Sequence, residues 1–221
     1  MTIDTKLFEY QGGGGPKYRE PRNKRYTVFI PGPPNCGKTR AAQDIILEMF
    51  PPDVIVYLFS PHKQERSLKL PTPPRRVALD VNKLKKVTIE ALREDAGPHP
   101  IVCLFDDIDL LRGKVQKSIQ DLMTELLANG RSHDHGQQHI HMIITNHALN
   151  DYNKTKYTTE NSEYFVIFPR ATPYSQLARL LAKTGASPQE IDFIRGLNVR
   201  RVLYHTQYPR FIKELEEPKK F

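Results

Sequence analysis

The chain has few cysteines and no long run of apolar residues. Only two of its 221 residues, Cys36 and Cys103, are cysteine. One lies in a loop pattern and the other in a strand pattern, which argues against a disulfide framework and favours a reducing compartment such as the cytosol or nucleus. No apolar run approaches the roughly 18 to 20 residues that span a bilayer, and no basic region followed by an apolar core opens the chain. We therefore expect neither a membrane span nor a signal peptide.

The sequence also lacks internal repeats and any helix-turn-helix or zinc-finger pattern, so sequence-specific reading of DNA is not indicated. Positive charge, in contrast, is abundant. The formal net charge is +8, and basic residues gather in segments 16–26, 75–86 and 198–220. Such clusters suit a polyanionic partner such as nucleic acid, but solvated surface faces have the same composition. Charge alone leaves both interpretations open.

Short apolar segments alternate with helical patterns along most of the chain. The segment IVCLF at 101–105 is apolar throughout, which is typical of a strand buried on both faces of a parallel sheet. The alternation predicts an α/β fold with a mainly parallel central sheet flanked by helices. Strands are expected at 26–30, 54–60, 101–105, 139–147 and 163–170, and helices at 39–50, 87–95, 114–130, 175–185 and 187–196.

The expected organisation is one domain that follows a flexible arm. Residues 1–24 contain GGGG and several charges, a composition typical of a flexible segment, and residues 25–221 form the domain. Segment 61–100 is rich in proline, lysine and arginine, and we expect an inserted loop or hairpin there. Residues 199–221 are expected to form a C-terminal extension.

The segment GPPNCGKT, Gly32 to Thr39, matches the phosphate-binding loop (P-loop, or Walker A) pattern at every required position. It lies between an expected strand and an expected helix, which is the context that the pattern requires. In such a loop the backbone N–H groups and the helix N-terminus bind phosphate. A lysine at the start of a helix is unfavourable because its charge opposes the helix dipole. Its position there indicates that an anion binds at this site.

The P-loop assigns a role to each of its side chains. Lys38 would reach the β- and γ-phosphates, and the Thr39 hydroxyl would ligate Mg²⁺. Gly32 and Gly37 allow the backbone to approach the phosphates, and Cys36 occupies a variable position of the pattern. ATP and Mg²⁺ are therefore the predicted cofactors, and the predicted nucleotide-binding residues are Gly32, Pro33, Pro34, Asn35, Cys36, Gly37, Lys38 and Thr39.

Two adjacent aspartates, Asp106 and Asp107, directly follow the apolar strand IVCLF. We predict that Asp106 belongs to the Mg²⁺ shell and that Asp107 is the catalytic carboxylate that polarises the attacking water. Many ATPases have glutamate at the second position, so Asp107 is shorter than usual. The alternative, that an aspartate only ends the strand or caps a turn, suits Asp109 better.

Polar residues also end the strand IHMIITNH, where Thr145 and Asn146 follow the apolar run. A polar side chain there can sense the γ-phosphate and hold the attacking water, and we assign that role to Asn146. An ordinary cap of the next turn is the alternative.

Four histidines, His133, His135, His139 and His141, raise the hypothesis of a zinc site. Their spacing fits neither a ligand pair on a helix nor a zinc ribbon, and no cysteine is near them in sequence. A polar loop that leads into a strand is the better interpretation.

Taken in order, the P-loop, the paired aspartates, GRSH, TNH and FPR resemble the motifs of the DNA-packaging ATPases of large eukaryotic DNA viruses. These poxvirus-type enzymes belong to the FtsK–HerA superfamily of P-loop ATPases, and the resemblance covers roughly residues 26–211. It implies an additional-strand P-loop NTPase that assembles as a homo-oligomeric ring and drives double-stranded DNA into a capsid. It also implies a capsid or portal partner, and a location at virus assembly sites in the host cytoplasm or nucleus, or in the virion.

The resemblance further implies that a basic residue from a neighbouring subunit completes each site. The family usually carries an arginine between the sensor and the following strand, but this chain has only Lys154 and Lys156 there. Arg131 and Arg170 are the other candidates, and Arg131 is preferred. We also list Arg131 with Lys38, Asp107 and Asn146 as a predicted catalytic residue.

Two other functions fit the P-loop. The first is a small-molecule phosphotransferase of the nucleotide-kinase type, which would need an acceptor pocket and an arginine-rich lid. The second is a scaffold that binds ATP without hydrolysing it.

Overall fold

In the described part of the chain, nine strands form one sheet in the order β1-β9-β8-β7-β2-β6-β5-β3-β4. The computed structural model describes residues 9–11, 24–62, 68–131, 138–147, 152–207 and 211–215. The strands are β1 (Glu9–Gln11), β2 (Thr27–Pro31), β3 (Ile55–Phe59), β4 (Arg75–Arg76), β5 (Ile101–Phe105), β6 (Ile140–Asn146), β7 (Tyr164–Ile167), β8 (Val202–His205) and β9 (Phe211–Glu214).

The sheet is mainly parallel. Strands β7, β2, β6, β5, β3 and β4 run in one direction, and only β8 is antiparallel to its two neighbours, β7 and β9. Strand β6 lies between β2, which leads into the P-loop, and β5, which ends at the paired aspartates. This inserted strand defines the additional-strand class, so the predicted fold class is confirmed.

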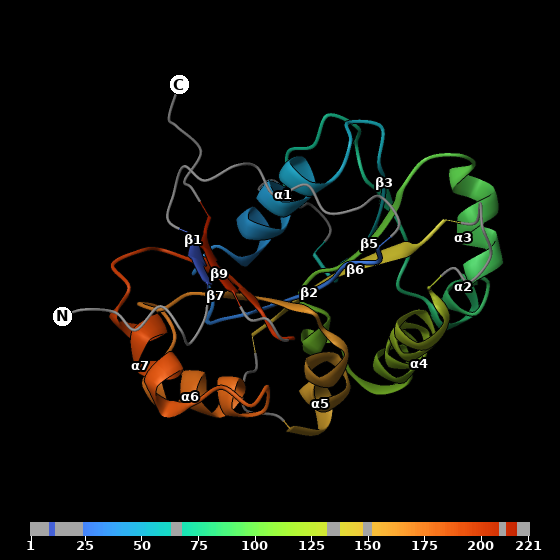
Figure 1. Cartoon of the computed structure of the whole chain (residues 1–221). Coiled ribbons are helices and arrows are strands. Elements are labelled where there is room, and N and C mark those ends of the chain that lie inside the picture. Colours follow the sequence, from blue (N-terminus) through green and yellow to red (C-terminus); the bar gives the residue numbers. More distant parts are fainter. Residues whose placement is uncertain are drawn as a thin grey trace.

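Helices cover both faces of the sheet, but unequally (Figure 1). Helix α1 (Lys38–Met49) lies on one face, while the other helices lie on the opposite face. The helices of this second face are α2 (Val81–Leu84), α3 (Ile89–Ala96), α4 (Gly113–Asn129), α5 (Tyr152–Asn161), α6 (Tyr174–Ala182) and α7 (Pro188–Gly196), and a 3-10 turn, η1 (Ile108–Leu110), follows β5.

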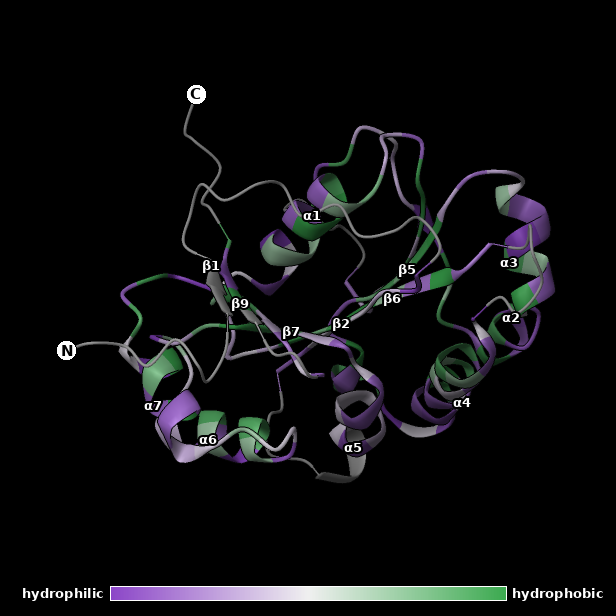
Figure 2. Ribbon diagram, in the orientation of Figure 1, coloured by the Kyte–Doolittle hydropathy of each residue, from purple (hydrophilic) through white to green (hydrophobic). Residues whose placement is uncertain are grey.

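Alternating strand residues supply two separate apolar cores, because successive side chains of a strand point to opposite faces. In β5, Val102 and Leu104 pack with α1, whereas Ile101, Cys103 and Phe105 pack with the helices of the other face. Both cores are apolar, as the green strands between the helices in Figure 2 show. A strand that is buried on both faces therefore needs an unbroken apolar run, which explains the sequence of β5.

The structure adds sheet strands where the sequence suggested appendages. Strand β1 lies within the expected arm and pairs with β9, and the rest of segment 1–23 lies outside the described residues. Strands β8 and β9 make the expected C-terminal extension part of the sheet. In segment 61–100, β4 pairs in parallel with β3, so this pair is not a hairpin, and two helices follow it. Strands β1, β4, β8 and β9 are short and flanked by charged residues, so the apolar pattern of the sequence does not indicate them.

A buried arginine fixes helix α4 to the start of β6. The Arg25 guanidinium donates to the carbonyls of Leu126, Leu127 and Ile140 at 2.7 to 3.0 Å. Two of these carbonyls belong to the last turn of α4, where a cation is favourable. Burial, and then the nearby Arg131, lower the pKa of Arg25 to about 10. Arg25 therefore stays charged at neutral pH.

None of the helices in the described part of the chain is both long and apolar enough to cross a membrane.

Candidate nucleotide-binding and catalytic site

The P-loop connects β2 to α1 through two left-handed backbone positions. Asn35 has a φ of 63° and Gly37 a φ of 102°, and Gly37 immediately precedes the first residue of α1. Among the described residues, no side chain caps the N-terminus of α1. The first backbone N–H groups of this helix are therefore left for an anion, which the helix dipole also favours.

Gly32 is required by close packing. A Cβ at this position would lie 2.6 Å from Cys36 Sγ and 3.2 Å from a ring carbon of Phe168. The backbone N–H of Gly32 donates to the carbonyl of Asn146 at 3.0 Å. The first glycine of the motif therefore anchors the loop to the ends of β6 and β7.

Lys38 is buried, and its ammonium is held inside the loop. Its Nζ donates to the carbonyls of Gly32 and Pro33, both at 3.3 Å, and lies 3.8 Å from Asp107 Oδ1. The predicted phosphate-binding lysine thus points to Asp107 rather than to solvent.

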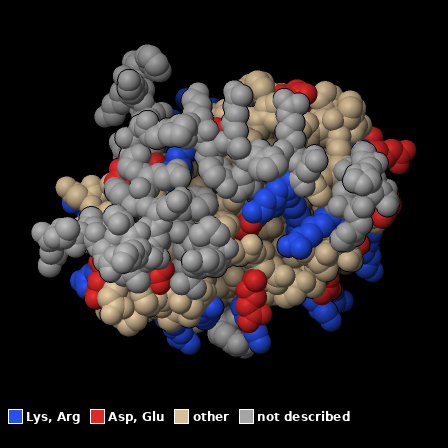
Figure 3. All heavy atoms as spheres, in the orientation of Figure 1, with Lys and Arg blue, Asp and Glu red and all other residues tan. Residues whose placement is uncertain are grey.

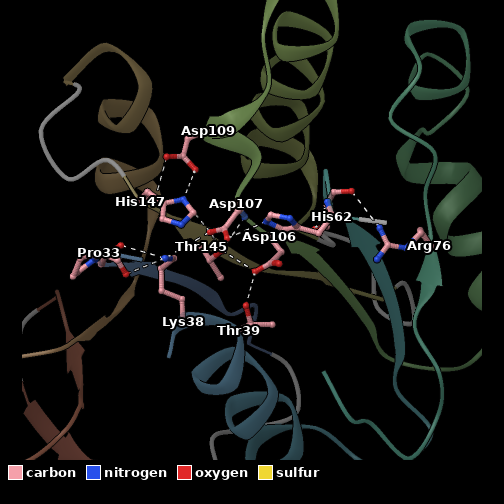
Figure 4. A network of polar contacts seen from close by, with 12 residues as sticks. Pro33, Lys38, Thr39, His62, Arg76, Asp106, Asp107, Asp109, Thr145 and His147 are labelled. Carbon is pink, nitrogen blue, oxygen red and sulfur yellow. Dashed lines mark hydrogen bonds and ion pairs between the residues drawn. The ribbon is translucent and has the colours of Figure 1, made fainter. Parts of the chain in front are cut away.

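Asp106 and Thr39, the two predicted Mg²⁺ ligands, are in direct contact (Figure 4). The Asp106 side chain is fully buried, and its Oδ1 accepts from Thr39 Oγ1 at 3.2 Å and from Thr145 Oγ1 at 2.9 Å. A hydroxyl and a carboxylate are the oxygen ligands that Mg²⁺ prefers. The Thr39 and Asp106 oxygens therefore suit Mg²⁺ beside a bound triphosphate.

Asp107 is also buried and adopts the left-handed region, with a φ of 52°. Its backbone N–H donates to Thr145 Oγ1 at 2.9 Å, and the same hydroxyl lies 3.2 Å from Asp107 Oδ1. A short polar side chain such as aspartate tolerates this conformation better than most residues. The local backbone thus offers a reason for aspartate, rather than the longer glutamate, at the second acidic position.

Two imidazoles face the Asp107 carboxylate, and the sequence analysis gave neither of them a role. His62 Nε2 lies 3.5 Å from Asp107 Oδ2, and His147 Nδ1 lies 3.4 Å from Asp107 Oδ1. His147 Nδ1 also lies 3.6 Å from Asp109 Oδ1. His147 belongs to the motif TNH, which is the signal that could have identified it. Asp107, Asp109 and His147 place potential metal-ligand atoms within 4.8 Å of one another.

Asn146 and Thr145 have different surroundings at the end of β6. Thr145 contacts both aspartates, whereas Asn146 is 4% exposed and its Oδ1 has no hydrogen-bond partner within the described part of the chain. Asn146 lines a cavity of about 280 Å³, together with Ile108, Asp109, Gln120, Asp121, Met123, Thr124, Leu127, Tyr157 and Thr158. The sensor role of Asn146 stays a prediction, and Thr145 is the residue that hydrogen bonds the aspartates.

The candidate basic residues lie in different places. Arg131 follows Gly130, whose carbonyl accepts from Ile140 at the beginning of β6, so it lies at the edge of the sheet opposite the P-loop. Arg170 instead lies beside the P-loop, in a cavity of about 360 Å³ lined by Asn35, Cys36, Phe168, Arg170, Ala171, Asn198, Val199 and Arg200. Lys156 is exposed on α5, and the side chain of Lys154 lies outside the described residues.

Of the four histidines considered for zinc, His133 and His135 lie outside the described residues. His141 is a core residue: its ring stacks on Tyr26 with centroids 5.3 Å apart, and its Nδ1 accepts from the backbone N–H of Tyr26 at 3.0 Å. Burial lowers the pKa of His141 to about 3. His141 therefore has a structural role in the core.

No protein-family profile matches the sequence, and no curated protein sequence matches it significantly. Solved structures do. The pCW3 conjugation coupling protein TcpA, in its monomer form with ATPγS, aligns over 86% of this chain and 60% of its own, with 10% identity and a TM-score of 0.55.

The chain has the fold of the P-loop ATPases. A second similar structure, the cytoplasmic domain of the Thermomonospora curvata type VII secretion ATPase EccC, has 12% identity and a TM-score of 0.47. That alignment covers 87% of this chain and 24% of the secretion ATPase. The chain therefore spans less than two thirds of the length of either structure.

Proposed function

We propose that this protein is an ATP-hydrolysing motor that translocates double-stranded viral DNA into a capsid. The observation that carries the ATPase part is the contact between Thr39 of the P-loop and Asp106, with the adjacent Asp107 at 3.8 Å from Lys38 of the same loop. The motif order, the additional-strand topology and the fold that the chain shares with the conjugation coupling protein support the motor.

The geometry suggests how hydrolysis proceeds. The β-phosphate of ATP binds to the N–H groups of the P-loop, and Lys38 exchanges the carbonyls of Gly32 and Pro33 for phosphate oxygens. Mg²⁺, when held with ATP by Thr39 and Asp106, would neutralise charge on the phosphates. The cavity beside Asn35 and Cys36 leaves room for the nucleoside.

In the chemical step, Asp107 accepts a proton from the attacking water. The water oxygen bonds to the γ-phosphorus, the bond between that phosphorus and the β–γ bridging oxygen breaks, and ADP leaves with the electron pair. The hydrogen bond from the Asp107 N–H to Thr145 and the distance of 3.8 Å between Asp107 and Lys38 support this proposed role.

Charge supports a nucleic-acid partner. The formal net charge is +8, and Figure 3 shows Lys and Arg side chains gathered near the middle of one face. Contacts to phosphates with release of counterions would give binding without sequence preference. A homo-oligomeric ring on a capsid or portal, at a virus assembly site, completes the proposal.

The test is phosphate release from ATP, measured with and without long duplex DNA. The wild-type chain should hydrolyse ATP, and duplex DNA should raise the rate. Asp107→Asn keeps a residue that tolerates the left-handed backbone but removes the base, so it should lower turnover by about 10²- to 10⁴-fold and still bind ATP.

A matched control is Asp53→Asn, which removes an exposed aspartate that pairs with His99 at a different place on the molecule. Unchanged phosphate release in Asp107→Asn would contradict catalysis and favour a different base. Turnover that ignores DNA, or transfer of phosphate to a nucleotide acceptor, would contradict the motor and favour the phosphotransferase.

A further inference from the structure

His147 lies directly between two carboxylates. It follows β6, and its Nδ1 lies 3.4 Å from Asp107 Oδ1 and 3.6 Å from Asp109 Oδ1. Figure 4 shows the imidazole between Asp109 and the aspartate pair. Both contacts use the same ring nitrogen, and both are within ion-pair range without hydrogen-bond geometry, because the buried Nδ1 has no hydrogen-bond partner among the described residues.

Asp109 holds His147 at two atoms. Besides the contact to Nδ1, its Oδ2 accepts from the backbone N–H of His147 at 3.1 Å. The Asp109 side chain is only 6% exposed and lies on the short turn η1, which begins directly after Asp107. This hydrogen bond joins the turn that follows β5 to the backbone of the residue that follows β6, and it keeps the imidazole of His147 close to both carboxylates.

Lys38 and His147 both face the same oxygen of Asp107. Lys38 Nζ lies 3.8 Å from Oδ1 and His147 Nδ1 lies 3.4 Å from it. A bound triphosphate carries several negative charges, and the proposed reaction assigns Lys38 to them. Asp107 then loses part of its cationic partner at the time when its carboxylate must face the attacking water.

We propose that His147 is a positioning residue that holds Asp107 in its catalytic orientation when Lys38 binds the phosphates, with Asp109 orienting His147. This inference rests on the proposed ATPase function. It deepens that function, because it assigns the motif TNH a role through its histidine and not only through Asn146.

His62 offers a contrast at the other oxygen of the same carboxylate. Its Nε2 lies 3.5 Å from Asp107 Oδ2, but its side chain is 45% exposed, against 22% for His147. An exposed side chain is held less firmly and its charge is screened by solvent. His62→Ala should therefore lower turnover less than the corresponding change at His147.

The test distinguishes variants that keep a nitrogen at the position of His147 Nδ1 from variants that do not. An asparagine at position 147 places its Nδ2 where the histidine has Nδ1, whereas a glutamine places its Nε2 where the histidine has Nε2. His147→Asn should therefore retain most of the wild-type kcat, and His147→Gln and His147→Ala should lower kcat by about 10- to 100-fold, as expected for a misplaced catalytic group.

Two further readouts separate positioning from a general loss of structure. The affinity for a fluorescent ATP analogue should stay within about twofold in all three variants, because the polar contacts of His147 in the described structure go to Asp107 and Asp109. In an Asp107→Asn background, His147→Ala should cause no further loss, because it acts through Asp107. His99→Ala removes an exposed imidazole that pairs with Asp53 and serves as the control.

Equal activity of the Asn and Gln variants would overturn the proposal, as would a loss of ATP affinity parallel to the loss of turnover. If His147→Ala does not fold, the Asn and Gln variants decide the question by themselves. The proposed function fails separately, because it fails when the wild-type chain releases no phosphate.

Discussion

At the scale of single residues, His141 shows how burial changes the chemistry of a side chain. The ring is packed against Tyr26 and Phe50, and its pKa falls from 6.5 to about 3. The cause is first the burial of the ring, and then repulsion from His139 and Arg25. In the folded chain His141 is therefore neutral at every pH at which the protein would normally be studied.

We predict that the free energy of unfolding decreases as the pH falls below 6.5. Between this value and about 3, the unfolded chain binds a proton at His141 that the folded chain does not. Each pH unit costs about 1.4 kcal/mol, or about 2 kcal/mol between pH 6.5 and 5. Urea unfolding at pH 7, 6 and 5 measures the slope.

His141→Asn is the matched variant, because its amide oxygen can still accept from the Tyr26 N–H but does not titrate. Between pH 6.5 and about 3, the free energy of unfolding of this variant should depend less on pH than that of the wild-type chain, by the uptake of about one proton on unfolding. An equal pH dependence in the two chains would contradict the prediction.

Glu163 affects the pH dependence of stability at lower pH. Burial opposes its ionisation, but hydrogen bonds from His205 and Lys24 outweigh this and lower its pKa from 4.5.

The sequence predicted most of the site at this scale, because the P-loop and the paired aspartates carry their chemistry in their spacing. It could not predict the left-handed backbone of Asp107, which depends on the hydroxyl of Thr145, 38 residues away. It also gave no role to His62 and His147, because contact with a carboxylate from another element leaves no local pattern.

At the scale of elements, one buried ion pair joins α1 to the strand β8. Arg201, which precedes β8, pairs with Asp44 of α1, and the two residues are 3% and 8% exposed. Arg40, one turn before Asp44, also contacts it at 3.2 Å but is only partly buried. The P-loop helix is thus tied to the antiparallel end of the sheet as well as to the strands beneath it.

We predict that Arg201→Met lowers the free energy of unfolding by about 3 to 5 kcal/mol, because Asp44 is then left buried with a weak partner. The double variant Asp44→Leu with Arg201→Met should recover much of this loss, since a buried ion pair can often be replaced by apolar groups. Chemical unfolding of the two variants measures the difference. A double variant that is less stable than Arg201→Met would contradict the argument.

Elements with a strong apolar pattern were predicted well, and polar or short ones were not. Helices α6 and α7 follow their periodicity, and Ser187 and Glu190 form a capping box at the start of α7. Helix α5 has the polar sequence YNKTKYTTEN and no apolar stripe, so periodicity could not reveal it. Strand β4 consists of two exposed arginines, and only its pairing with β3 makes it a strand.

At the scale of the whole molecule, the sheet order brings the separate motifs to one edge. Strands β2, β6 and β5 are parallel neighbours, so the P-loop, Thr145 and the aspartates all follow carboxyl ends that lie side by side. Binding sites of open parallel sheets lie at this edge. The gathering of these motifs could be predicted from their places after apolar strands. Contacts with a neighbouring subunit or with DNA could not, because they depend on molecules other than this chain.

The positions of the two cysteines allow thiol labelling to report whether nucleotide occupies the P-loop. Cys103 is fully buried in β5, whereas Cys36 lies in the P-loop and is only partly buried. Burial raises the pKa of the Cys36 thiol, and the positive charge of the nearby Lys38 opposes this rise. A maleimide should therefore modify one thiol of the native chain slowly, and both in denaturant. Bound ATPγS should protect Cys36, which mass spectrometry can follow. Equal labelling with and without nucleotide would mean that the P-loop had stayed empty.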